Sequence, residues 1–67
     1  MNSTKRNLFN ILKDFHPDKD FVVGVMSNAT HPEDQQTIID FMESEEKPTI
    51  EDIILLSLHL NQQRKKD

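Results

Sequence analysis

Three prolines, Pro17, Pro32 and Pro48, separate four segments that each contain a group of apolar residues. Because proline fixes its own backbone and keeps the preceding residue out of the helical region, a helix is expected to end before Pro17. Pro32 suits the first turn of a helix, and Pro48 closes an acidic stretch where the apolar pattern stops. The chain is therefore predicted to be all-α: a compact bundle of four short helices, arranged as helical hairpins, in a single domain over residues 1–67.

The first segment has the periodicity of an amphipathic helix that starts near Ser3 or Thr4 and ends before the corner at His16 and Pro17. Arg6, Lys13 and Asp14 fall outside the apolar face. At about 100° per residue, one arc of about 160° holds Leu8, Phe9, Ile11, Leu12 and Phe15.

The second segment, residues 21–26, contains a short β-branched run around Gly24 and fits either a buried strand or a short helix. A strand would need a partner, and no other segment alternates apolar and polar residues. Asp18 is a suitable N-cap for a helix. We therefore predict a short buried helix that ends near Asn28.

The last two helices have start signals of their own. Thr30, Pro32 and Glu33 combine an N-cap residue, a proline in the first turn and the spacing of a capping box. Thr49 precedes a first turn with two acidic residues, which is favourable against the helix dipole. The apolar stripe expected on the helix after Thr30 consists of Ile38, Ile39, Phe41 and Met42.

The final helix carries apolar residues over an arc of about 200°, which predicts a central helix packed by several neighbours. The arc contains Ile50, Ile53, Ile54, Leu56, Leu58 and Leu60. We expect Ile53 and Ile54 to be internal. Leu55 lies about 60° beyond the edge of the arc, beside Glu51, and is expected to face at least partly outward. Residues 61–67 are mostly polar and are predicted to form a fraying tail.

The composition narrows the class of protein. The chain has no cysteine, so it can have neither a disulfide framework nor a thiolate metal site, and a reducing cytoplasm is the expected setting. The longest apolar run, residues 53–56, is far shorter than the roughly 20 residues needed to cross a bilayer, so no membrane contact is expected. The first residues lack the apolar core and cleavage site of a signal peptide, and we expect no targeting signal.

No arrangement of residues indicates an enzyme, a metal site or a cofactor site. His16, His31 and His59 do not stand three or four positions apart, and none belongs to an HExxH motif. Acidic pairs such as Glu33–Asp34 and Glu45–Glu46 lie in expected first turns and loops, where the helix dipole and solvation explain them. We therefore expect a non-enzymatic protein with no metal and no cofactor.

Residues 15–20 contain a His-Pro-Asp tripeptide that resembles the signature loop of J-domain co-chaperones. That resemblance implies contact with an Hsp70-type ATPase through the loop. In a J-domain the tripeptide joins two long antiparallel helices, the first of them basic. Here the helix before His16 carries only three cations, and an apolar segment follows Asp20 at once. We therefore predict a helix corner in which Pro17 ends one helix and Asp18 begins the next.

Charge is distributed unevenly along the chain. Residues 1–13 carry a net charge of +3, residues 14–52 carry −9 and residues 53–67 carry +2, which leaves −4 for the whole chain. An acidic centre disfavours nucleic acid and favours a basic protein partner.

Together these features predict a small acidic non-enzymatic module that binds another protein, or a second copy of itself as a homodimer, through an apolar helical face. The residues expected at this contact are Glu51, Leu55, Leu56 and His59. The alternative is a helix-turn-helix type nucleic-acid-binding regulator that uses the basic ends of the chain, including the cluster at residues 62–66. A steep salt dependence of DNA binding would favour this alternative.

Overall fold

Four α-helices make up most of residues 3–65, the part of the chain that this computed structural model describes. They are α1 (Ser3–Phe15), α2 (Lys19–Asn28), α3 (Pro32–Ser44) and α4 (Ile50–Lys65). No strand occurs in this range, so the all-α prediction is confirmed, and residues 21–26 are helical as predicted.

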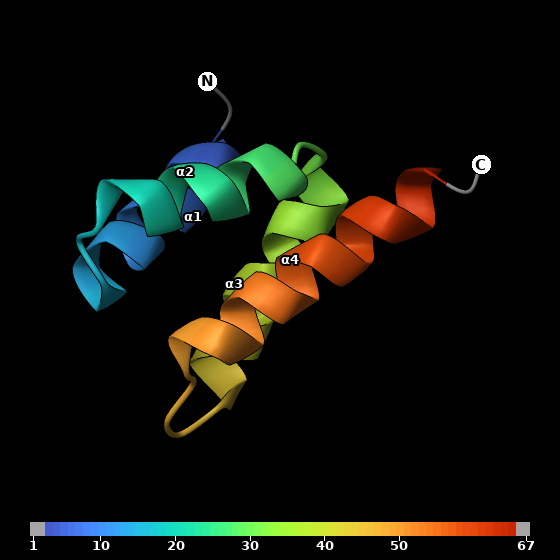
Figure 1. Ribbon diagram of the computed structural model, residues 1–67. Coiled ribbons are helices and arrows are strands. Elements are labelled where there is room, and N and C mark those ends of the chain that lie inside the picture. The colour runs from blue at the N-terminus through green and yellow to red at the C-terminus, as the bar shows by residue number, and fades with distance from the viewer. Residues whose placement is uncertain (1–2, 66–67) are drawn as a thin grey trace.

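The helices form two hairpins that pack across each other (Figure 1). α1 packs mainly against α3, and α2 packs mainly against α4. In the described part of the chain, α4 makes no comparable contact with α1. The prediction of a central last helix with several neighbours is therefore wrong, because α2 and α3 alone cover α4 and its remaining side faces solvent.

Two helix starts follow from side chains that satisfy free backbone N–H groups. The Asp18 carboxylate accepts hydrogen bonds from the N–H groups of Asp20 (2.8 Å) and Phe21 (3.3 Å). Thr49 Oγ1 accepts a hydrogen bond from the N–H group of Asp52 (3.0 Å). The caps predicted at Asp18 and Thr49 are therefore confirmed.

The start of α3 differs from the prediction. Thr30 is not the N-cap, because α3 begins at Pro32 and His31 holds the N-cap position without a side-chain cap bond. Since Pro32 takes the first helical position, the cap falls one residue after Thr30 and the predicted capping-box spacing is lost. The loop is held instead by Gln35, whose Nε2 donates to the carbonyl oxygen of Ala29 (3.0 Å).

The core lies where the two hairpins cross, and α4 contributes least to it. The buried apolar residues are Leu8, Leu12, Phe21, Val22, Val25, Ala29, Ile38, Ile39 and Ile53. Only Ile53 comes from α4, although that helix is rich in isoleucine and leucine. Phe41 and Met42, which were expected on the α3 stripe, are half-buried against this core.

The exposure of the α4 side chains corrects the predicted burial of its apolar arc. Ile53 is fully buried, as expected, but Ile54 is 36% exposed and Leu58 is 40% exposed. The prediction of an internal Ile54 is wrong because the buried residue one turn after Ile53 is Ser57, so the inner face of α4 turns away from Ile54. Leu55 is 56% exposed, which confirms that it faces outward.

The fraying tail predicted over residues 61–67 overlaps the last turns of α4. α4 continues to Lys65, and Asn61 and Arg64 make hydrogen bonds to residues about 30 positions earlier in the chain. These bonds give the last turns of α4 partners that the local sequence does not reveal. Residues 66 and 67 lie outside the described residues.

The matched variants Ile53→Ala and Ile54→Ala test this orientation of α4. Removing the fully buried Ile53 side chain leaves a cavity and should lower the free energy of unfolding by about 2–5 kcal/mol. The same truncation at the part-exposed Ile54 should cost less than about 1.5 kcal/mol. Urea denaturation followed by far-UV circular dichroism measures both losses. Equal losses would mean that Ile54 belongs to the core.

Candidate functional site

Beyond Ile53, polar side chains share the inner face of α4 with Leu56 and Leu60, which are half-buried against the core. Ser57 is fully buried, and its hydroxyl donates to the carbonyl oxygen of Ile54 (2.8 Å). From α2, Asn28 Nδ2 donates to Ser57 Oγ (3.3 Å), and Asn28 Oδ1 accepts from Asn61 Nδ2 (3.1 Å). Because Ser57 and Asn61 stand one turn apart, Asn28 bridges two successive turns of α4.

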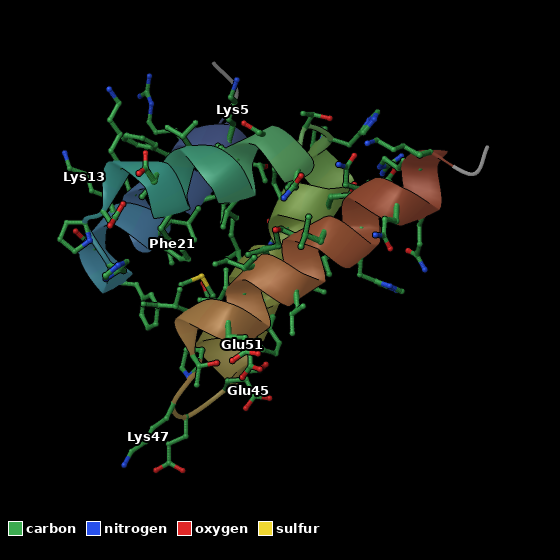
Figure 2. All side chains as sticks on the ribbon, in the orientation of Figure 1. Lys5, Lys13, Phe21, Glu45, Lys47 and Glu51 are labelled. Carbon is green, nitrogen blue, oxygen red and sulfur yellow. The ribbon has the colours of Figure 1, made fainter. Side chains whose placement is uncertain are left out.

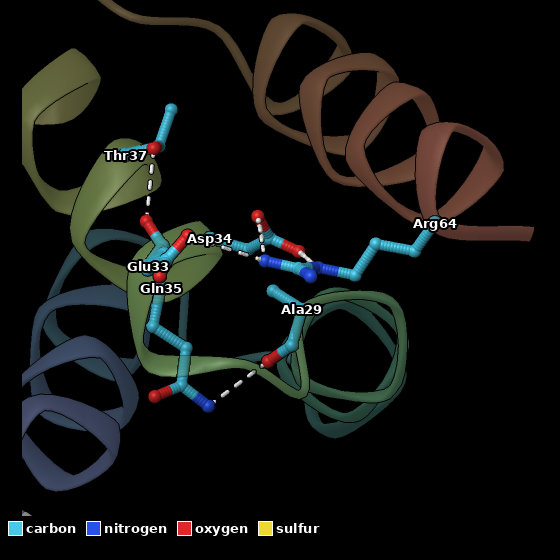
Figure 3. A network of polar contacts seen from close by, with 6 residues as sticks. All are labelled: Ala29, Glu33, Asp34, Gln35, Thr37 and Arg64. Carbon is cyan, nitrogen blue, oxygen red and sulfur yellow. Dashed lines mark hydrogen bonds and ion pairs between the residues drawn. The ribbon is translucent and has the colours of Figure 1, made fainter. Parts of the chain in front are cut away.

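The same face of α4 ends in an ion pair with the start of α3 (Figure 3). Arg64 binds both carboxylate oxygens of Asp34, with Nε donating to Oδ2 and Nη2 donating to Oδ1 (3.1 Å). Glu33 Oε2 lies 3.7 Å from the same Nη2. The Asp34 carboxylate is buried, so Arg64 supplies the cation that a carboxylate in this position requires.

These contacts form a set that we call the polar seam, which consists of Asn28, Asp34, Ser57, Asn61 and Arg64. The seam sets the rotation of α4. At about 100° per residue, positions 53, 57, 61 and 64 share one face, and positions 54, 58 and 55 lie about 65°, 105° and 165° from its centre. The exposed fractions of Ile54, Leu58 and Leu55 rise in that same order, so these three side chains lie away from the seam. Ile50 lies close to the seam face and is exposed because it stands at the first position of α4.

Four apolar side chains on α4 form the candidate surface, which we call the α4 stripe: Ile50, Ile54, Leu55 and Leu58. They are four of the seven large apolar residues that are exposed within residues 3–65. Ile50, Ile54 and Leu58 succeed one another turn by turn, and Leu55 adjoins them, so the group is continuous along the helix. Single exposed apolar residues are common, whereas a continuous group of this kind is typical of a contact surface.

Acidic residues border the α4 stripe at the loop end of the α3–α4 hairpin. Glu51 and Asp52 are exposed in the first turn of α4, and Glu45 and Glu46 are exposed in the loop before it. Figure 2 shows Glu45 and Glu51 projecting at this end of the molecule, with Lys47 beyond them on the loop. The border of the apolar stripe at its loop end is therefore mainly acidic.

The four residues predicted at a partner contact are placed differently from one another. Leu56 is half-buried and packs against the core. Ile54 was predicted to be internal, and Leu58 was predicted only as a member of the apolar arc, because apolar spacing alone does not show that polar residues lie opposite the inner face of α4. The other three predicted residues are exposed one turn apart on α4: Glu51, Leu55 and His59.

The His-Pro-Asp tripeptide forms the corner between α1 and α2. α1 ends at Phe15, and Asp18 caps α2, so the corner predicted from Pro17 and Asp18 is confirmed. The His16 ring packs edge-on against the Phe21 ring with 5.4 Å between their centroids, and His16 Nε2 lies 4.0 Å from Asp18 Oδ2. His16 and Asp18 therefore both have structural contacts within the corner.

Comparisons with known proteins do not place the chain in a family. No family model matches it, and neither a curated protein nor a solved structure matches it. Over residues 3–65, no helix has both the length and the apolar composition to cross a membrane. In the same residues, no three histidine, aspartate or glutamate side chains gather as metal ligands would.

Arg64→Leu tests whether the polar seam holds α4 in place. The change leaves the buried Asp34 carboxylate without its cation and should lower the free energy of unfolding by about 1–3 kcal/mol. This loss is smaller than for a fully buried pair, because the Arg64 side chain is itself part-exposed. The matched control is Lys65→Leu at the next, exposed position, where the change should be about 0.5 kcal/mol or less. Urea midpoints measure both, and equal effects would contradict a holding role for the seam.

Proposed function

We propose that the protein is a small non-enzymatic protein-binding module whose contact surface is the α4 stripe. The observation that carries the proposal is the orientation of α4: the helix turns polar residues inward and leaves Ile54, Leu55 and Leu58 exposed. Burial of apolar surface stabilises a folded chain by about 25 cal/mol per Å². A chain of 67 residues has little stability to spare, and exposing this apolar surface to water lowers its stability further. Such exposure is expected when another molecule covers the surface.

The border of the stripe defines the chemistry of the partner. Acidic residues surround the end of the stripe next to the α3–α4 loop, among them Glu45, Glu51 and Asp52. They favour a protein that presents an apolar patch edged by lysine or arginine. Such rim charges raise the association rate and discriminate against acidic partners more than they add affinity. The proposal includes a cytoplasmic setting, which the absence of cysteine supports.

The alternative, a helix-turn-helix type nucleic-acid-binding regulator, would depend on the cations near the C-terminal end. Arg64 is one of them, and its guanidinium is bound to the Asp34 carboxylate with Glu33 nearby. A phosphate at this position would compete with two carboxylates. The acidic centre of the chain also repels a polyanion, so the protein-binding function has the better support.

Leu58→Glu places a charge within the α4 stripe and tests the proposal. Because Leu58 is already 40% exposed, the variant should lose no more than about 1 kcal/mol of unfolding free energy. A carboxylate left unpaired in an apolar contact should weaken partner binding at least about tenfold. The measurement is affinity capture from source cells with wild-type and variant baits, quantified by mass spectrometry. Calorimetric titration of the captured protein then gives the change in affinity.

Gln63→Glu is the matched control, because it adds the same charge to the same helix at an exposed position outside the stripe. The wild-type and Gln63→Glu baits should retain the same protein, and the Leu58→Glu bait should lose it. Equal retention by all three baits would contradict the proposal. Capture of nucleic acid with a steep salt dependence would instead support the alternative function.

A further inference from the structure

An apolar groove lies between α1 and α2 at the surface of their hairpin. Two adjoining hollows share Phe9, Val22 and Val23. One hollow continues to Pro17 at the α1–α2 corner, and the other continues to Met26 near the end of α2. We refer to the two hollows together as the α1–α2 groove.

The charged residues that line the α1–α2 groove are lysines. Lys13 and Lys19 line the hollow at the corner, and Lys5 lines the other. Figure 2 shows Lys5 and Lys13 projecting from this hairpin. Although the chain as a whole has a net charge of −4, no carboxylate of residues 3–65 lines the groove. The groove is therefore an apolar surface edged by cations.

We propose that the α1–α2 groove binds the α4 stripe of a second copy of this chain. The inference rests on the proposed function, because it takes the α4 stripe as a contact surface and names its partner. The stripe has the form that a groove between helices accepts, with apolar residues on successive turns at Ile50, Ile54 and Leu58. Its acidic border is opposite in charge to the lysines of the groove, which is the complementarity that a specific contact requires.

The size of the chain is consistent with a contact of moderate strength. A stable protein interface buries about 800 Å² on each partner. The accessible surface of the chain is 4717 Å², so one interface of that size would take about a sixth of it. The groove and the stripe each offer only a few apolar side chains, so the area they bury is expected at the lower end of the range for specific interfaces. Association through such a contact should depend strongly on concentration.

The contact joins two different surfaces and is therefore heterologous. The groove belongs to α1 and α2, whereas the stripe belongs to α4. When one copy places its stripe in the groove of the next, a free groove remains at one end of the pair and a free stripe at the other. Heterologous contacts of this kind extend into rings or chains instead of stopping at a symmetric dimer.

Two variants remove the two surfaces separately. Val23→Glu places a carboxylate in the groove at a residue that is 52% exposed, where it should disturb the groove more than the fold. Leu58→Glu places a carboxylate in the stripe, also at an exposed residue, and should disturb the stripe more than the fold. Lys13→Glu is a second groove variant for the case that Val23→Glu fails to fold, and Gln63→Glu remains the control on α4. Far-UV circular dichroism establishes that each variant is folded.

The test is sedimentation velocity from low micromolar to millimolar concentration. The wild-type chain and Gln63→Glu should show a weight-average mass that rises with concentration above the 7.9 kDa of one chain. Each of the two surface variants alone should stay monomeric, with association weakened at least tenfold. An equimolar mixture of Val23→Glu and Leu58→Glu should form a dimer of one copy of each and nothing larger, because together they hold one intact stripe and one intact groove.

Several results would overturn the inference. A wild-type chain that stays monomeric throughout, or a mixture of the two variants that stays monomeric, would show that the groove does not bind the stripe. Self-association that survives in Val23→Glu but not in Leu58→Glu would assign the contact to two α4 stripes. A monomeric mixture together with binding of Leu58→Glu, but not Val23→Glu, to vesicles containing phosphatidylglycerol would assign the groove to an anionic lipid surface.

These results also separate this inference from the proposed function. A monomeric wild-type chain whose α4 stripe still captures a different protein would leave the proposed function in place and overturn only the inference about a second copy. Loss of both self-association and capture in the wild-type chain would overturn both.

Discussion

The polar seam is the interaction on which the position of α4 depends. Asn28 joins α2 to Ser57 and Asn61, and Arg64 joins the end of α4 to Asp34 at the start of α3. Directional bonds of this kind fix the rotation of a helix, which nondirectional apolar contacts do not. Once α4 is rotated in this way, Ile53 remains its single buried apolar residue, and the α4 stripe faces solvent.

Most of the fold could be predicted from local signals in the sequence. Helix ends and helix caps depend on residues two or three positions apart, so they can be predicted from the sequence. Examples are the end of α1 before Pro17, the cap at Asp18 and the cap at Thr49. The rotation of α4 could not be predicted, because Ser57 and Arg64 find their partners about 30 residues away. Apolar periodicity alone predicted that Ile54 would be internal. A single sequence contains no signal that Asn28 of α2 and Asp34 of α3 bond to polar residues of α4.

The candidate site shows the same division between local and long-range information. Leu55 was expected to face outward because it lies outside the apolar arc, and the structure confirms this. Leu58 is exposed because the hydrogen bonds of the polar seam rotate α4 so that this side chain faces solvent. Charge in the fold is divided between two surfaces, since lysines line the α1–α2 groove and carboxylates border the loop end of the α4 stripe. A net charge of −4 hides this division.

The most direct test of the account is the solvent exposure of individual methyl groups on α4. Methyl NMR spectra of the chain, recorded at a concentration where it is monomeric and with an added soluble paramagnetic agent, report how closely the agent approaches each side chain. If the polar seam sets the rotation of α4, the methyl groups of Ile54, Leu55 and Leu58 should relax strongly, while those of Ile53 stay protected. Protection of Ile54 and Leu58 equal to that of Ile53 would show that the apolar arc is buried, and would contradict both the seam and the contact surface derived from it.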